Sequence, residues 1–153
     1  MNLFNEHVPF NVLKGKTLIA VEKFCYYEDH LVFKTSDGDI YLMAHDQDCC
    51  EEVYIDDVCG DFEDLLNEEI LVADELSGDV TDEERSTYGS CSWTFFHLAT
   101  LHGDVTIKWF GTSNGCYSES ANLYKINSRD YECIKDDVKK NNSLIYKNVW
   151  EQV

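Results

Sequence analysis

The chain has one proline among its 153 residues, no low-complexity tract, and no apolar run near the roughly 18 residues of a membrane-spanning helix. These absences exclude collagen-like proteins, linkers and proteins that cross a membrane with helices. The N-terminus also lacks the basic region and apolar core of a signal peptide. We therefore expect a cytoplasmic protein without a membrane partner.

Basic residues are missing from residues 46–84, which contain 17 Asp and Glu but no Lys or Arg. The whole chain has 30 acidic and 12 basic residues, for a formal net charge of −18. Outside the acidic stretch the charges nearly cancel, at −2 for residues 1–45 and +1 for residues 85–153. A concentrated negative field repels nucleic acid and attracts a basic protein surface. We expect no direct binding of nucleic acid.

The remaining composition is that of a folded protein, because hydrophobic residues make up 44% and aromatic residues 13% of the chain. Alternating apolar and polar residues predict strands, and the aromatic segments 93–96 and 109–110 predict core and cross-strand packing. We expect one domain over residues 1–153, of the α+β class, with a mainly antiparallel sheet and about two helices. The predicted strands cover residues 18–24, 30–34, 40–44, 53–58, 70–73, 92–100, 105–110 and 121–126. The predicted helices cover residues 61–67 and a segment from Ser128, with an exposed loop over 74–91 and a strand or second helix over 143–150.

The seven cysteines are odd in number and irregular in spacing, so a disulfide framework is a poor interpretation. His45, Cys49 and Cys50 have the spacing at which an imidazole and a thiolate bind one zinc ion, and we predict structural Zn²⁺ there. A strand-end histidine with two buried thiols is the competing interpretation. Cys59 is nearest in sequence, but a straight strand over 53–58 would carry it about 20 Å away at roughly 3.3 Å per residue. The fourth ligand stays open among a carboxylate and the residues Cys91, His97, His102 and Cys116.

Catalytic signatures are missing, since no G-x-G-x-x-G, P-loop, H-E-x-x-H or G-x-S-x-G motif occurs. A thiol-dependent enzyme with Cys49 or Cys50 as the nucleophile is one hypothesis. The acidic surroundings of both cysteines disfavour the thiolate that such chemistry needs. We therefore expect a stoichiometric binding protein rather than an enzyme, with no catalytic residue.

The acidic stretch has a specific use in a binding protein. Phosphates recur about every 1.7 Å along the axis of DNA, and proteins that hold nucleic acid line the groove with Lys and Arg. A folded surface of carboxylates without cations can occupy such a groove by imitating that charge. Solvated acids that only promote solubility are the alternative. The acids that the predicted turn and helix hold rigid, and that we expect to contact a partner, are Asp56, Asp57, Asp61, Glu63 and Asp64.

Two parts of the sequence carry a family resemblance. One is the run His45-x-Gln47-Asp48-Cys49-Cys50-Glu51-x-Val53-x-Ile55-x-Asp57-x-x-Gly60-Asp61. The other comprises Trp93-Thr94-Phe95 and Trp109-x-Gly111-x-Ser113-Asn114-Gly115-x-Tyr117-Ser118-Glu119. Over about residues 30–125 the chain resembles a family of small uncharacterised domains found in bacteriophages and mobile elements, with the His-x-Gln-Asp-Cys-Cys element as its most specific part. A C-terminal helical extension over about residues 128–150 lies outside the resemblance. The chain has Lys108 where arginine is frequent in the family, and Cys116 in place of an aromatic residue, which argues against Cys116 as a ligand.

The resemblance implies a function but no settled activity. Small acidic phage proteins of this kind include anti-CRISPR proteins, and some inhibitors of type II effector nucleases contain zinc. With the acidic stretch, it implies a phage-encoded protein of the bacterial host cytoplasm that binds a type II CRISPR effector nuclease and blocks binding of target DNA. A zinc-containing accessory or interaction domain with another basic protein partner is the second hypothesis.

Overall fold

The computed structural model describes residues 3–26, 28–140 and 145–148, which form two antiparallel sheets, two α-helices and two 3-10 turns. The strands are β1 (His7–Val8), β2 (Leu18–Tyr26), β3 (Glu28–Thr35), β4 (Ile40–Ala44), β5 (Glu52–Cys59), β6 (Val72–Gly78), β7 (Ser90–Thr100), β8 (Gly103–Ser113), β9 (Asn122–Ile126) and β10 (Ile145–Asn148). The helices are α1 (Asp82–Tyr88) and α2 (Ser128–Lys140), and the 3-10 turns are η1 (Phe10–Leu13) and η2 (Phe62–Leu65). The α+β prediction, with a mainly antiparallel sheet and about two helices, is confirmed.

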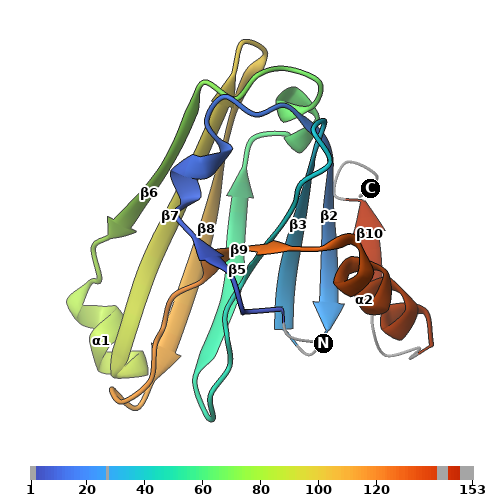
Figure 1. The fold of residues 1–153 in the computed structure, drawn as a ribbon. Coiled ribbons are helices and arrows are strands. Elements are labelled where there is room, and N and C mark those ends of the chain that lie inside the picture. Colours follow the sequence, from blue (N-terminus) through green and yellow to red (C-terminus); the bar gives the residue numbers. More distant parts are fainter. Residues whose placement is uncertain (1–2, 27, 141–144, 149–153) are drawn as a thin grey trace.

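The two sheets face each other (Figure 1). The six-stranded sheet has the order β1-β9-β4-β3-β2-β10, and the four-stranded sheet has the order β5-β8-β7-β6. Their facing sides form the main core, in which Phe33 and Met43 of the first sheet belong to one cluster with Phe96 and Trp109 of the second. The indole Nε1 of Trp109 donates a hydrogen bond of 3.2 Å to the sulfur of Met43. This contact satisfies the indole N–H within the apolar layer.

Helix α2 covers the other face of the six-stranded sheet (Figure 1). Tyr131 and Ile134 of α2 belong to a second core with Phe24 and Leu42. The hydroxyl of Tyr131 donates a hydrogen bond of 2.6 Å to the carboxylate of Glu22, which is also buried. The helical spacing of the apolar residues after Ser128 therefore predicted this helix correctly. Among the described residues, no helix is long and apolar enough to cross a membrane.

The sequence-based prediction fails mainly between residues 61 and 91. The helix predicted over 61–67 is a single 3-10 turn, η2. The strand predicted over 70–73 is β6, which extends to Gly78. The loop predicted over 74–91 is wrong, because it contains the end of β6, all of α1 and the start of β7. Of the segment 143–150, residues 145–148 form the strand β10 and the others lie outside the described residues.

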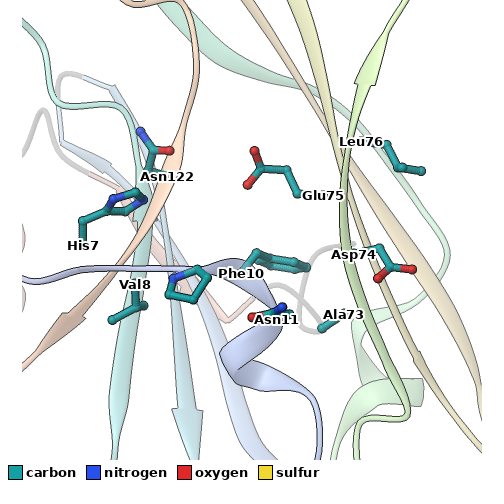
Figure 2. Close-up of a pocket in the computed structure, with 10 residues that line it drawn as sticks. His7, Val8, Phe10, Asn11, Ala73, Asp74, Glu75, Leu76 and Asn122 are labelled. Atoms are coloured by element: carbon teal, nitrogen blue, oxygen red, sulfur yellow. The ribbon is translucent and has the colours of Figure 1, made fainter.

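A pocket of about 460 Å³ lies where β6, an edge of the four-stranded sheet, approaches β1, an edge of the six-stranded sheet (Figure 2). Its walls come from these two strands, from η1 and from the first residue of β9. The pocket contains none of the acidic, histidine or cysteine residues that the sequence singled out as a site.

Candidate functional site

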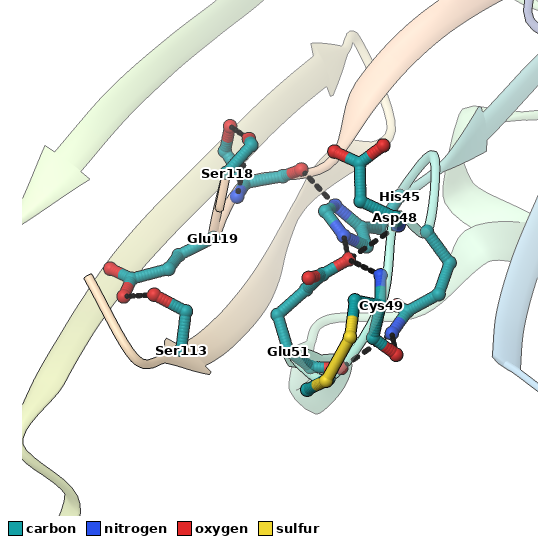
Figure 3. A network of polar contacts seen from close by, with 10 residues as sticks. His45, Asp48, Cys49, Glu51, Ser113, Ser118 and Glu119 are labelled. Atoms are coloured by element: carbon teal, nitrogen blue, oxygen red, sulfur yellow. Dashed lines mark hydrogen bonds and ion pairs between the residues drawn. A yellow bond between two sulfur atoms is a disulfide. The ribbon is translucent and has the colours of Figure 1, made fainter. Parts of the chain in front are cut away.

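The loop of residues 45–51 joins β4 to β5 and folds around the carboxylate of Glu51 (Figure 3). Oε1 of Glu51 accepts hydrogen bonds from the backbone N–H of Asp48, at 2.6 Å, and of Cys49, at 3.3 Å. Nε2 of His45 lies 3.2 Å from the same oxygen, and Nδ1 of His45 lies 2.9 Å from the carbonyl oxygen of Ser120. Because a carbonyl only accepts, Nδ1 carries a hydrogen and donates it to Ser120, and Nε2 faces the carboxylate of Glu51.

Glu51 is held as a carboxylate in the interior. Burial alone would raise the pKa of Glu51, but the hydrogen bonds from the Asp48 N–H, His45 and the Cys49 N–H lower the pKa to about 2. Gln47 closes the loop from its other side, since its amide Nε2 donates to the carbonyl oxygens of Glu51, at 2.7 Å, and Cys49, at 3.2 Å. The polar residues of the motif thus have structural partners within the loop.

Cys49 and Cys50 lie at the exposed tip of this loop, and their sulfur atoms are bonded to each other in a disulfide (Figure 3). The competing interpretation of two buried thiols is therefore wrong. His45, in contrast, is buried and directed at Glu51 and Ser120. Within the described part of the chain, no three His, Cys, Asp or Glu side chains form a group able to hold a metal ion.

The residues in this disulfide form do not fit a zinc site, because zinc binds thiolates and a disulfide offers none. Zinc at His45, Cys49 and Cys50 stays a prediction for the reduced protein. Both histidines considered as a fourth ligand have carboxylate neighbours: Nε2 of His97 lies 3.1 Å from Asp104, and Nε2 of His102 lies 3.1 Å from Glu68.

A second carboxylate lies behind the loop. Glu28 lines a pocket of about 370 Å³ together with Asp29, Glu51 and Tyr54, and Oε2 of Glu28 and Oε2 of Glu51 are buried without a hydrogen-bond partner among the described residues. Burial raises the pKa of Glu28, and the positive charge of His45 offsets part of this rise, whereas the negative charge of Glu51 adds to it. The folded protein therefore raises the pKa of Glu28 and lowers the pKa of Glu51, although both carboxylates line the same pocket. No motif in the sequence indicated Glu28.

The predicted partner-contacting acids lie at one end of β5 and on η2. Asp56 is exposed at a bulge, where the register of β5 against β8 shifts between Ile55 and Asp57. Asp57 is exposed and lies opposite Lys108 in the register. Gly60 then turns the chain with a φ of 108°, in a place where a side chain would collide with the backbone of Asp104.

The other three acids belong to the turn η2. Asp61 caps η2, because its side chain accepts a hydrogen bond of 2.9 Å from the N–H of Glu63. Glu63 is exposed, whereas Asp64 is half-buried against Gly103. Four of the five predicted acids are thus exposed, and the 3-10 turn η2 takes the place of the helix on which the prediction put Asp61, Glu63 and Asp64.

The acidic stretch does not form one continuous surface. Its residues in β5 lie at one edge of the four-stranded sheet and those in β6 lie at the other edge, whereas η2 contacts β7 and β8 near their connecting hairpin and α1 contacts β7. Three strand spacings separate β5 from β6, or about 14 Å at about 4.8 Å per spacing. The carboxylates of β5 and β6 therefore form two lines along opposite edges of one sheet, and those of η2 lie near the hairpin between β7 and β8.

Between these lines, the outer face of the four-stranded sheet carries aromatic side chains. The ring of Phe110 lies 4.6 Å from that of Trp93, 5.2 Å from that of Tyr88 and 6.0 Å from that of Tyr54. Phe110 is buried beneath these neighbours, but Tyr54 is 36% and Tyr88 50% exposed. The next residues along the strands, Lys108, Phe95 and Leu76, continue the same face in register. We call Tyr54, Leu76, Tyr88, Trp93, Phe95 and Phe110 the outer aromatic face.

The aromatic segments make both kinds of contact that the sequence predicts, core packing and cross-strand packing, on opposite faces of the sheet. Phe96 and Trp109 do enter the main core, whereas Trp93, Phe95 and Phe110 point to the opposite side. Helix α1 is fixed at the end of this face by Glu84, whose Oε2 accepts a hydrogen bond of 2.7 Å from Nε1 of Trp93. The alternation of residues 93–96 could have indicated two aromatic faces on one strand.

The segment between β8 and β9 is held by Glu119. Its carboxylate accepts hydrogen bonds from the hydroxyls of Ser90, at 2.6 Å, Ser92, at 2.7 Å, and Ser113, at 2.5 Å (Figure 3 shows the contact with Ser113). Burial would raise the pKa of Glu119, but these three donors lower it. In the sequence, the alternation of Ser90 and Ser92, which places both on one face of β7, was the feature that could have indicated this cluster of hydroxyl donors.

Comparison with known proteins adds a family but no activity. The model of a protein family described as "Domain of unknown function (DUF7448)" matches residues 11–123. The matched segment contains the whole loop of residues 45–51, both edges of the four-stranded sheet and Glu119. Neither the curated proteins nor the solved structures gave a match.

Proposed function

The chain belongs to the DUF7448 family, and we propose that this domain is a stoichiometric binding protein that docks on a basic surface of another protein. The specific form of the proposal is an anti-CRISPR protein that binds a type II CRISPR effector nuclease. Such a nuclease holds its guide–target duplex in a positively charged channel. An acidic domain that occupies this channel blocks the binding of target DNA.

The observation that carries the proposal is the unpaired state of the exposed acids. Among the described residues, none of Asp56, Asp57, Asp61 and Glu63 lies within 4.0 Å of a basic nitrogen. Aligned carboxylates without counter-charges repel one another, so their presence on rigid elements costs stability that a basic partner would return. The strand β5 and the capped turn η2 keep these groups in place before binding, which lowers the entropy cost of association.

The outer aromatic face adds apolar contact area, which the charged groups do not provide. Interfaces owe most of their affinity to a few aromatic and arginine side chains near the centre, surrounded by polar groups. Tyr54, Leu76 and Tyr88 offer exposed apolar area in such a centre, and the two acidic edges form its rim. Arginine suits this surface, because a guanidinium stacks on an aromatic ring and pairs with a carboxylate.

Neutralisation of the acids tests the proposal in a cleavage-inhibition assay with a purified type II effector nuclease. The triple variant D56N/D57N/E63Q removes three exposed charges, and the variant E6Q/E132Q/D136N removes three exposed charges elsewhere. The first variant should lose at least tenfold in inhibition, and the second should lose less than twofold. Inhibition by the wild type should also weaken steeply as salt rises.

Two results would contradict the proposal. Equal inhibition by the wild type and a variant neutralised at all five acids, Asp56, Asp57, Asp61, Glu63 and Asp64, would exclude the charge mechanism. Turnover of a substrate that depends on Cys49 or Cys50 in the folded protein would favour the enzyme hypothesis instead.

A further inference from the structure

Strand β6 has a free edge that β5 lacks. In the described residues β6 pairs with β7 alone, so alternate residues of β6 direct their N–H and C=O groups away from the sheet. On the opposite edge of the same sheet, the N–H of Ile55 in β5 already donates a hydrogen bond of 2.8 Å to Asp29 of β3. Although η1 packs against part of β6, β6 offers these unpaired backbone groups to a strand from another molecule.

The pocket of about 460 Å³ lies along this free edge. Four consecutive residues, 73–76, line it, which brings the backbone of β6 to its wall. Figure 2 shows Glu75 directed across the pocket towards His7 and Asn122, whereas Asp74 and Leu76 point away from it. Glu75 is exposed, and no hydrogen bond or ion pair of its carboxylate is found among the described residues.

The floor of the pocket is apolar. Val8, Pro9 and Phe10 line it, and the ring of Phe10 is fixed 4.9 Å from the ring of Phe96 in the main core. An apolar floor with one carboxylate above it matches the side chain of lysine or arginine, which has an apolar stem and a cationic end. The pocket thus has the shape and charge for one long basic side chain.

A second copy of this chain is a poor occupant. Antiparallel pairing of two β6 strands about their centre would place Glu75 opposite Glu75, and like charges directly opposite are destabilising. The neighbouring acids Asp74, Asp79 and Asp82 are exposed and add to this repulsion. The same charges attract an extended basic segment.

We propose that an extended, basic segment of the partner protein adds to the free edge of β6 and places a lysine or arginine side chain in the adjoining pocket beside Glu75. This inference rests on the proposed binding of a basic protein and names the mode of that binding. Backbone hydrogen bonds to β6 provide affinity, and the pocket selects the basic side chain, as in other cases of strand addition.

The test uses a fluorescent peptide, acetyl-Lys-Val-Lys-Val-Lys-Val-Lys-amide, and the full chain at about 0.15 M salt, the physiological ionic strength. Fluorescence anisotropy gives the affinity, and amide shifts in NMR spectra locate the peptide. The control peptide has the same sequence with every amide N-methylated, so it keeps its charge and cannot pair as a strand. The variant E75Q removes the pocket carboxylate, and E132Q, which removes an exposed carboxylate on α2, is the matched control.

The expected result is a set of amide shifts confined to β6 and the pocket, with the N-methylated peptide at least tenfold weaker. E75Q should weaken binding about fivefold, which corresponds to ~1 kcal/mol, and E132Q should change it less than twofold. Equal binding of both peptides, shifts confined to β5 and η2, or a dimer that E75Q strengthens would overturn the inference. None of these results touches the proposed function, which fails only if the five neutralised acids leave inhibition of the partner unchanged.

Discussion

Nε2 of His45 lies 3.2 Å from Oε1 of Glu51, and both side chains are buried. The pair joins the end of β4, in the six-stranded sheet, to the start of β5, in the four-stranded sheet. Nδ1 of His45 extends the link to Ser120, just before β9. The polar residues of the loop 45–51 therefore connect the two sheets, which is a structural role that the zinc prediction did not anticipate.

Substitution of Glu51 should make stability less sensitive to acid. The folded protein lowers the pKa of Glu51 from 4.5 to about 2, so its contribution is complete above about pH 4.5 and is lost as the pH falls towards 2. The variant E51Q should therefore have a Tm several degrees below that of the wild type at pH 7, and the difference should shrink between pH 4.5 and 2.

Thermal melts monitored by circular dichroism over this pH range check the prediction, with the exposed neighbour in E52Q as the control. A difference in Tm that stays constant from pH 7 to pH 2 would mean that the ionised carboxylate of Glu51 is not what stabilises the loop. The double variant H45A/E51Q should lose less than the two single variants together, because the two side chains interact directly.

Glu28 should behave in the opposite way. Burial raises its pKa, so the charged form is penalised in the folded state and the penalty disappears as the pH falls below its unfolded value of 4.5. The variant E28Q should raise the Tm by a few degrees at pH 7 and leave it unchanged at pH 4 and below. Melts of E28Q beside the exposed control E6Q give the answer, and a lower Tm at pH 7 would show that Glu28 has a partner that needs its charge.

The strands that face a core on at least one side were predictable from the sequence. Residues 40–44 form β4 with the bounds expected, since this strand is buried on both faces and reads as a continuous apolar run. Strand β6 was cut short, because only Ala73 of its seven residues is buried and the rest resembles a loop. Helix α1 was missed although Thr81 and Glu84 form a capping box, a signal that the sequence contains.

The candidate site divides in the same way. The acids Asp56, Asp57, Asp61 and Glu63 are exposed, but Asp61 and Glu63 belong to a 3-10 turn and its cap rather than to the predicted helix. The separation of the acidic stretch onto two edges was not predictable, because it depends on β7 and β8 lying between β5 and β6. Glu28 was invisible for a similar reason: its proximity to Glu51 arises from the approach of two strands of different sheets.

Substitutions of Phe95 and Phe96 should lower the free energy of unfolding by different amounts, because the two side chains lie on opposite faces of β7. Phe96 is wholly buried in the main core, so F96A should cost about 3–5 kcal/mol of unfolding free energy. Phe95 lies on the outer aromatic face, half-buried beside Trp93, and F95A should cost about 1 kcal/mol. Urea denaturation measures both values, with F96L in reserve if F96A does not fold. Equal costs would place Phe95 in a core and remove it from the proposed docking surface.

Reduction should decide whether Cys49 and Cys50 bind zinc. In the disulfide form the pair has no thiolate to offer, so the oxidised protein should contain no zinc after dialysis. After reduction, Cys49, Cys50 and His45 become available as ligands, and the sequence predicts one zinc ion per chain. Metal analysis by mass spectrometry on untagged protein, with a chelator added during a thermal melt, measures both content and effect on stability.

The variant C49S/C50S separates the two roles of the loop. It should abolish zinc binding while His45, Gln47 and Glu51 keep their hydrogen bonds, so its Tm should stay close to that of the oxidised wild type. A reduced wild type that takes up zinc and gains several degrees in Tm, both lost in the double variant, supports the structural zinc site. A reduced wild type without zinc would contradict the zinc prediction. The loop 45–51 would then be held by hydrogen bonds without a metal, with the carboxylate of Glu51 as the acceptor for the backbone N–H groups of Asp48 and Cys49.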